Sequence, residues 1–368
     1  MEKLTTIGIL TFHNANNYGA VLQAYALQTY LGKDDFTKVE IIDFCTKAHI
    51  KSARIFKRKS ENGLKNIILQ ALTCLRYIPL HKKKMKFESF RQDFLHLSKH
   101  KYTSERDFLT NISPYDVYIS GSDQVFNPNI EFSQVYYLNF HPSYGKKIAY
   151  APSFGISTFN DEIKNKILPF LQDFQSLSCR ENVGAQYMSK ILKKNIPTVL
   201  DPVFLIKKEE WESIMKIPEE NYKYIFVYDL CGGKELIKIS KRLKEITGLK
   251  IICATAHTKE FYSGCKSKYS IGPLELLGYI NRAEYVVTDS FHGTSLSIIL
   301  NTKVLSYIAL PHVSNRITSI MEQLHIKDQI ITNVNNFNFS SIKFTNYQTE
   351  LQSLISSSKN YLKKALNN

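Results

Sequence analysis

The sequence predicts an α/β protein with two Rossmann-like domains that face each other across a cleft. The chain has 368 residues, which is long for one hydrophobic core and ordinary for two. Short β-branched runs alternate with helical patterns along most of it, as parallel βαβ units require. A polar stretch punctuated by proline, Lys207–Asn221, interrupts this alternation, and we place the domain boundary there.

The first domain, residues 1–207, opens with a strand, a polar loop and a helix. Thr6–Phe12 is a β-branched apolar run, and Ala20–Leu31 repeats apolar residues at helical spacing. Residues 47–111 are rich in basic residues and are interpreted as a helical insertion or connecting layer. Further strands are predicted at 38–44, 116–120, 147–150 and 198–200, and further helices at 161–174 and 183–193.

The second domain, residues 221–335, repeats the alternation. Strands are predicted at 224–230, 250–254, 285–288 and 303–307, and helices at 234–247, 272–281 and 292–300. Residues 336–368 form a C-terminal loop and a helix over 349–366. Because the polar loops of both domains follow strands, parallel sheets would direct them to one cleft.

The charge of the chain is concentrated in one segment. The formal net charge is +15, and Lys47–Arg91 contains 13 Lys and Arg residues against two acids, Glu61 and Glu88. Such a cluster indicates an acidic partner, either anionic lipid, a phosphorylated substrate or nucleic acid, unless it is simply a solvated helical face. Nucleic acid is the least favoured partner, because no helix-turn-helix, zinc-finger spacing or aromatic RNA-binding pattern accompanies the charge.

The cysteines and the apolar runs favour a cytoplasmic protein. Six scattered cysteines form no C-x-x-C pair, which is typical of reduced thiols. The first apolar run is too short for a signal peptide. The longest one, Ile67–Leu80, is interrupted by Gln70, Arg76 and Pro79 and is too short to span a bilayer. We therefore expect no transmembrane segment.

The sharpest motif is Val286–Thr294, where an apolar strand runs into a helix that begins near His292. The free N–H groups and dipole of such a helix N-terminus attract an anion. Asp289 or Ser290 can cap the helix, Gly293 permits close approach of a ligand, and His292 can exchange a proton near neutral pH. A capped structural helix is the alternative, but the convergence of these residue types at one turn favours a functional site.

Two arginines are candidates for holding an anion. Arg180 can bind a carboxylate or phosphate through two parallel hydrogen bonds, unless it only pairs with Glu181 at the surface. Arg316 follows the last strand of the second domain and could contact an anion or belong to the first turn of a helix. A metal is not expected, because the chain has no D-x-D, no H-E-x-x-H and no cysteine pair.

Two further polar loops could hydrogen-bond a sugar or simply cap helices. Asn16–Gln23 contains one glycine and is no dinucleotide fingerprint. Ser120–Gln124 places small and acidic residues at a strand end, which suits a polyol or a phosphate. The candidate substrate-binding residues are Asn17, Tyr18, Gly19, Ser122 and Asp123, together with Arg180, Ser290, Gly293, Thr294 and Arg316.

Five strings together resemble one family. They are Asn17–Gln23, Ser120–Asn127, Ser178–Glu181, Asp201-Pro202 and Asp289–Gly293, and their order and spacing are similar to those of polysaccharide pyruvyl transferases. The resemblance covers about residues 5–325. It implies a fold like glycosyltransferase-B and transfer of a pyruvyl group from phosphoenolpyruvate to a sugar, which forms a cyclic ketal. Family members usually serve capsule, exopolysaccharide or cell-wall polymer assembly, with phosphoenolpyruvate as donor substrate and no separate cofactor.

The resemblance also implies roles for single residues. The family's histidine corresponds to His292 and its first arginine to Arg180. We interpret His292 as the acid/base, Asp289 as the residue that orients it, and Arg180 and Arg316 as ligands of phosphate and carboxylate. Many members carry a second arginine where this chain has Ser290, so either Arg316 replaces it or the donor differs.

The two domains and the basic segment acquire expected roles as well. We expect the first domain to bind the acceptor sugar and the second domain to bind the donor. The acceptor sugar would be carried on a lipid pyrophosphate, and residues 47–91 would contact the anionic inner face of the plasma membrane.

Two other functions remain open. A nucleotide-sugar glycosyltransferase of the same fold would hold a diphosphate at Asp289–Thr294. A non-catalytic binding protein of a polysaccharide-assembly complex would explain the missing arginine at Ser290.

Overall fold

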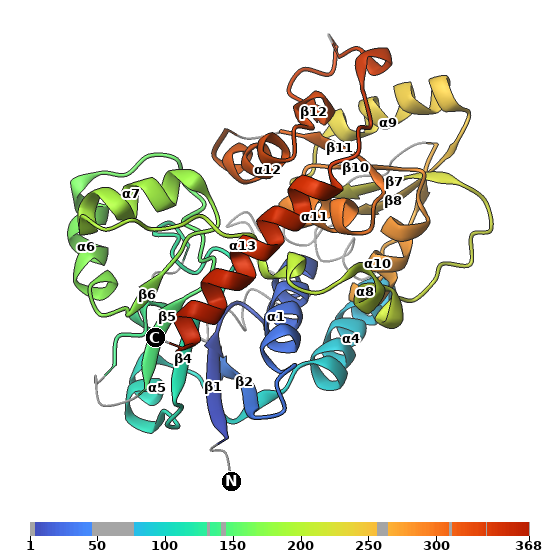
Figure 1. Cartoon of the computed structure of the whole chain (residues 1–368). Helices are drawn as coiled ribbons and strands as arrows, with labels where there is room; N and C mark the ends of the chain where they lie inside the picture. The colour runs from blue at the N-terminus through green and yellow to red at the C-terminus, as the bar shows by residue number, and fades with distance from the viewer. Residues whose placement is uncertain are drawn as a thin grey trace, which may run out of the picture.

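The computed structural model describes residues 4–45, 77–130, 133–140, 145–255, 264–308, 311–335 and 337–367. Within these ranges the chain forms two six-stranded sheets in which every strand pair is parallel (Figure 1). The strand orders are β3-β2-β1-β4-β5-β6 and β9-β8-β7-β10-β11-β12. Both halves therefore have the same doubly wound topology, which confirms the prediction of two Rossmann-like units.

The first sheet is built on β1 and β4, which pair with each other at its centre. Its inner strands are almost continuously buried, as expected for a parallel sheet covered on both faces. Its strands are β1 (Thr5–Leu10), β2 (Thr37–Phe44), β3 (Leu97–Tyr102), β4 (Val117–Ser120), β5 (Lys146–Ala149) and β6 (Ser176–Leu177), and its helices are α1 (Tyr18–Leu31), α4 (Tyr77–Phe94), α5 (Glu105–Asn111), α6 (Asp161–Leu171) and α7 (Asn182–Leu192).

Two parts of the prediction for this domain are wrong. Leu97–Tyr102, inside the supposed helical layer of residues 47–111, is strand β3, which pairs with β2 at the edge of the sheet. Its inner residues Lys99, His100 and Lys101 are exposed, so its charges face solvent. The predicted strand at 198–200 is reduced to one bridge between Cys179 and Thr198. Residues 47–76 of the basic segment lie outside the described residues.

The second sheet follows the predicted alternation closely. Helix α9 has the predicted bounds, and Gly248 at its end has φ 71, the left-handed conformation that suits a glycine after a helix. The strands are β7 (Tyr224–Asp229), β8 (Lys250–Thr255), β9 (Lys266–Ser267), β10 (Tyr285–Thr288), β11 (Lys303–Tyr307) and β12 (Ile330–Ile331), and the helices are α9 (Lys234–Thr247), α10 (Pro273–Arg282), α11 (Phe291–Ile299) and α12 (Pro311–Gln323).

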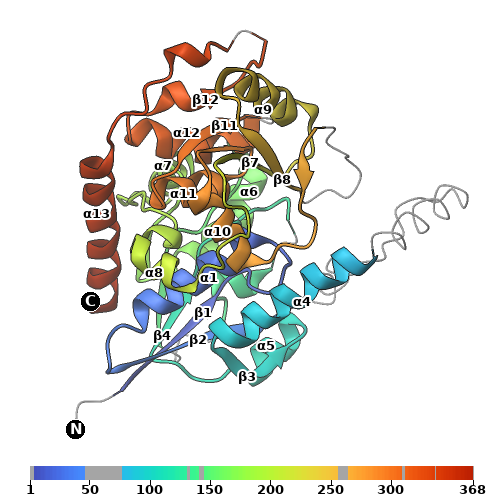
Figure 2. The same cartoon turned by 90° about the vertical axis from the view of Figure 1, so that its right-hand side faces the viewer.

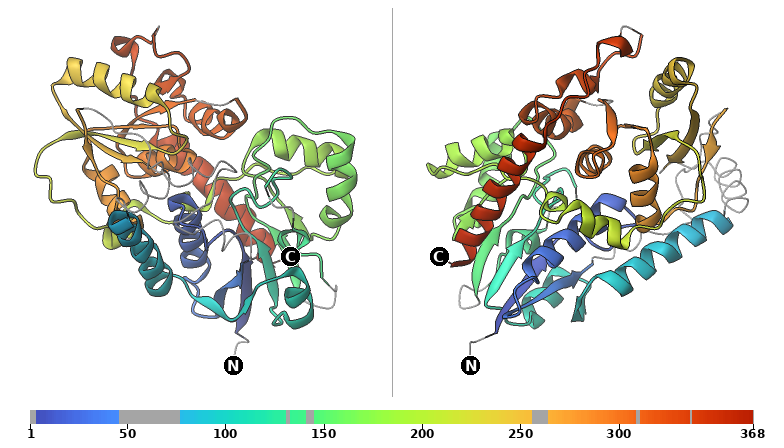
Figure 3. Two further views of the ribbon diagram at one scale, coloured as in Figure 1. Left: turned by 180° about the vertical axis from the view of Figure 1, so that it is seen from behind. Right: turned by 45° about the vertical axis from the view of Figure 1, so that its right-hand side comes forward.

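Two segments tie the domains together. Helix α8 (Lys208–Ile214) lies in the linker, where buried Trp211 donates a hydrogen bond to the Val203 carbonyl. Helix α13 (Gln348–Asn367) returns from the second domain and packs on the first, as Figures 1 and 3 show. There the Tyr361 hydroxyl donates to the Ala149 carbonyl at 2.9 Å, and the Ser358 hydroxyl accepts from the Leu200 N–H at 2.9 Å.

The carboxyl ends of the two sheets face each other. Helix α1 begins after β1 and α11 begins after β10, and their N-termini meet where Gly19 touches the ring of His292. The Tyr18 hydroxyl also crosses the interface and donates to the Ile271 carbonyl at 2.9 Å. The polar loops of both domains therefore converge on one cleft. Across the described ranges, every helix is too short or too polar to cross a bilayer.

Candidate functional site

Asp201 is the centre of the site. It is 1% exposed and begins the 3-10 turn Pro202–Phe204, where its Oδ1 accepts a hydrogen bond from the Val203 N–H at 3.1 Å. Its Oδ2 accepts from Arg180 Nη1 at 2.6 Å and from the Ser122 hydroxyl at 3.0 Å. One carboxylate thus holds together the loops that follow β4, β6 and the linker to the second domain.

Arg180 joins the two domains. Its guanidinium lies 4.6 Å from the ring centre of Phe291, the first residue of α11, and its Nη2 lies 3.9 Å from Asp123 Oδ1. Its Nε and Nη2 are buried and have no hydrogen-bond partner among the described residues. Because unpaired donors of a buried cation are costly, these two atoms are suited to a bound anion.

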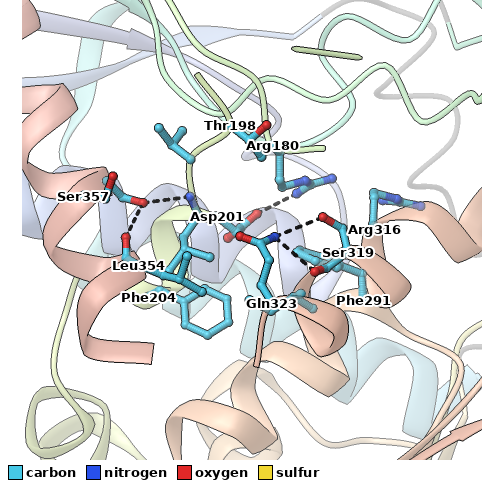
Figure 4. A pocket seen from close by; sticks show the side chains of 14 residues that line it. Arg180, Thr198, Asp201, Phe204, Phe291, Arg316, Ser319, Gln323, Leu354 and Ser357 are labelled. Carbon is cyan, nitrogen blue, oxygen red and sulfur yellow. Dashed lines mark hydrogen bonds and ion pairs between the residues drawn. The ribbon is translucent and has the colours of Figure 1, made fainter. Parts of the chain in front are cut away.

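Arg316 belongs to the same cluster. It projects from α12 and lies 5.9 Å from the ring centre of Phe291 (Figure 4). Its Nε is also buried without a partner in the described part of the chain. Burial, and then the charge of Arg180, lower the pKa of Arg316 to about 10, so that it still carries its charge at neutral pH. Two guanidinium groups therefore compete for the same few acids, and an added anion would relieve both.

His292 lies in the first turn of α11, with its Nε2 3.5 Å from Asp201 Oδ2. This separation is within ion-pair distance but does not make a hydrogen bond. On the other side of the ring, a Cβ atom at Gly19 would overlap Nδ1, so only glycine leaves space for the histidine. Burial alone would raise the pKa of Asp201, but His292, Arg180 and the Val203 N–H together hold it well below its usual range.

The structure does not bring Asp289 to His292. The Asp289 carboxylate accepts hydrogen bonds from the Leu230 and Cys231 N–H groups at 2.8 and 3.0 Å, in the loop that follows β7. Burial raises its pKa. The sequence predicts Asp289 beside the histidine, and the structure has Asp201 there instead. The sequence signal for Asp201 is the Asp-Pro pair that directly follows an apolar run.

The remaining residues of the 286–294 motif make structural contacts. Ser290 caps α11, since its hydroxyl accepts from the Gly293 N–H at 3.2 Å. A Cβ at Gly293 would lie 2.6 Å from Thr288 Oγ1, so the glycine allows the helix to pack against the sheet. The Thr294 hydroxyl lies 2.7 Å from that of Ser306, inside the second domain.

The loop after β1 contributes a cap and an interface residue. Asn17 caps α1 by accepting from the Ala20 N–H at 3.3 Å. The buried Tyr18 ring packs against Phe87 and lies 4.6 Å from Lys83 Nζ, so it serves the domain contact. Gly19 is the residue of this loop that touches the histidine.

Two hollows flank the arginine–histidine cluster. A cavity of about 230 Å³ lies over the carboxyl ends of β1, β2 and β4, and Asp123 forms part of its wall. A more open hollow of about 530 Å³ lies between the start of α7 and α12, and it is lined by Glu181, Thr198 and Ser319 among others. We call the first hollow the β1–β4 cavity. Both hollows are larger than the space beside Arg180 and Arg316, which measures about 30 Å³.

Comparison with solved structures supports the fold. UDP-N-acetylglucosamine 2-epimerase from Rickettsia bellii superposes with a TM-score of 0.53 at 12% identity, over 100% of this chain and 97% of that chain. The E. coli heptosyltransferase WaaC matches with a TM-score of 0.38 at 11% identity, over 87% of this chain and 99% of that one. The first likeness confirms the glycosyltransferase-B-like architecture, and at this identity it speaks for the fold alone.

Comparison of sequences identifies the family. No curated protein matches the chain significantly. The family model for polysaccharide pyruvyl transferase matches residues 17–309, which include Gly19, Arg180, Asp201 and His292. The chain therefore belongs to the polysaccharide pyruvyl transferase family.

Proposed function

We propose that this protein transfers a pyruvyl group from phosphoenolpyruvate to a sugar of a surface polysaccharide or its lipid-linked precursor, forming a cyclic ketal. The observation that carries the proposal is the pair of buried arginines with unpartnered donors beside a histidine–aspartate pair. Phosphoenolpyruvate carries two anionic groups, a carboxylate and a phosphate. Arg180 and Arg316 can each bind one of them, and no separate cofactor is needed.

The reaction asks for proton transfer and for stabilisation of a leaving phosphate. A proton adds to the methylene carbon of phosphoenolpyruvate, which becomes the methyl group of the product. One sugar hydroxyl adds to the resulting cation at C2, the C2–O bond to phosphate breaks, and a second hydroxyl closes the ring. Of the two hydroxyl protons, one replaces the proton given to the methylene carbon and the other leaves with phosphate.

Named residues match these tasks. His292 would deliver the proton, and the ionised Asp201 beside it would stabilise the ring while it carries the extra proton. Arg180 and Arg316 would offset the charge on the departing phosphate. The place of Arg316 next to Phe291 supports the view that it compensates for Ser290, where many relatives have an arginine.

A thermal-shift titration tests the donor. We expect phosphoenolpyruvate to raise the melting temperature in a concentration-dependent way, because a ligand at 100 times its Kd stabilises the folded state by about 2.7 kcal/mol. Arg316→Ala should abolish this shift without unfolding the protein, since Arg316 has no carboxylate partner within ion-pair distance in the described ranges. Arg282→Ala, at an exposed arginine on α10, should leave the shift intact.

The outcomes of this titration separate the competing functions. A shift with UDP-, GDP- or CMP-sugars alone would identify a nucleotide-sugar glycosyltransferase instead. A melting temperature that responds to no donor would favour the non-catalytic binding protein. Either result would overturn pyruvyl transfer.

We also propose that α4 contacts an anionic lipid surface, which would place the protein at the inner face of the plasma membrane. Phe87 and Phe90 are buried, whereas Ile78 and Met85, seven residues apart on the outer face, are 67% and 49% exposed. Lys82 and Lys84 lie on the turns between these two apolar residues. Figure 2 shows this helix along the outside of the molecule. Exposed apolar residues among lysines are typical of contact with lipid headgroups.

Vesicle binding checks this contact. Lys82→Gln with Lys84→Gln should weaken binding to vesicles of phosphatidylcholine and phosphatidylglycerol roughly 30-fold, at about 1 kcal/mol for each lysine. Lys238→Gln with Lys241→Gln on α9 is a matched control, because each pair contains one lysine bonded to a glutamate. Equal binding to neutral vesicles, or an equal loss in the control, would contradict the proposal.

A further inference from the structure

The β1–β4 cavity has the chemistry of a sugar site. Its wall includes the aromatic rings of Phe12 and Tyr136, which pack edge to face at 5.1 Å. The side chains of Asn14, Asn17 and Gln124 supply amide groups, and no Lys or Arg is found among the residues that line it. Aromatic surface with neutral hydrogen-bonding groups fits a polyol better than an anion. At about 230 Å³, the space is many times what one water needs.

His13 lines this cavity, and both of its ring nitrogens have partners. His13 Nδ1 lies 3.1 Å from the Thr11 carbonyl oxygen, and its Nε2 lies 3.1 Å from Asp43 Oδ1. The histidine is 1% exposed, and both ring nitrogens are engaged. His13 therefore shapes the cavity and leaves no ring nitrogen to take a proton from a ligand.

Asp123 is the residue that connects this cavity with the arginines. It lines the cavity, and its Oδ1 accepts from the Gln124 N–H at 2.9 Å and lies 3.9 Å from Arg180 Nη2. Its Oδ2 has no partner in the described ranges, although its side chain is only 13% exposed. One carboxylate oxygen is thus held in place while the other remains available to a ligand.

The backbone of Asp123 is held in an uncommon conformation. Its φ is 71, in the left-handed region that costs a residue with a side chain some free energy. A bridge to Pro152 and a hydrogen bond from the Ser153 N–H to the Asp123 carbonyl at 2.8 Å fix it there. The surrounding structure therefore fixes the backbone from which this carboxylate projects.

We propose that the β1–β4 cavity binds the acceptor sugar and that Asp123 takes the proton from its attacking hydroxyl. This inference rests on the proposed pyruvyl transfer. As the hydroxyl oxygen bonds to C2 of phosphoenolpyruvate, its O–H bond breaks and the proton passes to Asp123 Oδ2. His292, whose Nε2 lies 3.5 Å from Asp201 Oδ2, gives the proton to the methylene carbon. Asp123 later releases its proton to the departing phosphate. The proton of the second hydroxyl, which closes the ring, returns to His292, so the protons balance.

Sugar binding tests the cavity. Saturation-transfer NMR with the methyl glycosides of glucose, galactose, mannose and N-acetylglucosamine should show a signal from at least one of them. Ile130→Trp, at an exposed residue on the cavity wall, should remove that signal. Ile246→Trp, at an exposed isoleucine in the last turn of α9, should leave the signal unchanged. Silence from all four glycosides, or a signal that survives Ile130→Trp, would overturn the assignment.

Kinetics of the responding glycoside test the carboxylate. Asp123→Asn should lower kcat for phosphate release from phosphoenolpyruvate by about 100-fold or more, while the glycoside signal and the thermal shift with phosphoenolpyruvate persist. The acid limb of the wild-type pH profile should be missing in this variant. An unchanged kcat and pH profile would refute the role of Asp123. A wrong assignment of the donor can be distinguished from a wrong role for Asp123. The wild-type protein would then show the glycoside signal but no thermal shift from phosphoenolpyruvate.

Discussion

Replacing Arg180 with alanine should lower the free energy of unfolding by about 3–5 kcal/mol and abolish the response to phosphoenolpyruvate. The reason is the environment of Asp201, which is 1% exposed and relies on Arg180 for its shortest hydrogen bond, 2.6 Å. Without the guanidinium, the buried carboxylate keeps, among the described residues, Ser122, Val203 and the longer contact with His292. Urea denaturation followed by circular dichroism measures the loss.

A double variant tests whether the stability loss comes from leaving the charge of Asp201 without its partner Arg180. Arg180→Met with Asp201→Asn removes both charges, so it should be more stable than Arg180→Ala alone. Arg282→Ala, on the surface of α10, should change stability by no more than about 0.5 kcal/mol. If Arg180→Ala were as stable as this control, the ion pair would not hold the site together.

The same pair makes stability depend on pH in a defined direction. The pKa of Asp201 is lowered in the folded protein, so its contribution is fully present above the unfolded value of about 4. It is lost as the pH falls below that value toward the folded pKa. In Asp201→Asn this acid-side loss should be smaller than in the wild type.

Local sequence patterns were sufficient to predict most of the helices and strands. Helix α9 begins and ends as predicted because apolar residues recur at helical spacing between Gly233 and Gly248. Strand β3 was missed because it lies at a sheet edge and exposes Lys99, His100 and Lys101. What makes it a strand is its pairing with β2, more than 50 residues earlier in the chain, and periodicity carries no information about such a partner.

The site depends still more on contacts that are distant in sequence. The positions of Arg180, His292 and Arg316 in loops at strand ends predict that they belong to the site, because parallel sheets gather such loops at one edge. The carboxylate beside the histidine could not be chosen in the same way. Asp289 is three residues from His292 in sequence, whereas Asp201 reaches it from the other domain. The 3-10 turn Pro202–Phe204, which Asp201 begins, packs against α11 and so brings Asp201 beside the ring.

The largest effect on catalysis should come from His292. His292→Ala is expected to lower kcat by about 100- to 10,000-fold, the usual contribution of a general acid or base, while phosphoenolpyruvate still raises the melting temperature. Phosphate release in the presence of an acceptor that the wild type uses is the measurement. His100→Ala provides the control, because His100 also pairs with a carboxylate, Asp107 at 3.2 Å, but on the surface.

Gly19→Ala tests whether the position of the ring matters, and not only its presence. The added Cβ would overlap His292 Nδ1, so either the ring moves away from Asp201 or α1 shifts. We expect a kcat that lies between the values for the wild type and for His292→Ala. The KM for phosphoenolpyruvate should change little, because the arginines are untouched. If His292→Ala kept more than a tenth of the activity, the histidine would not be the proton donor. If Gly19→Ala alone were fully active, the ring would act without the geometry that Asp201 and α1 impose on it.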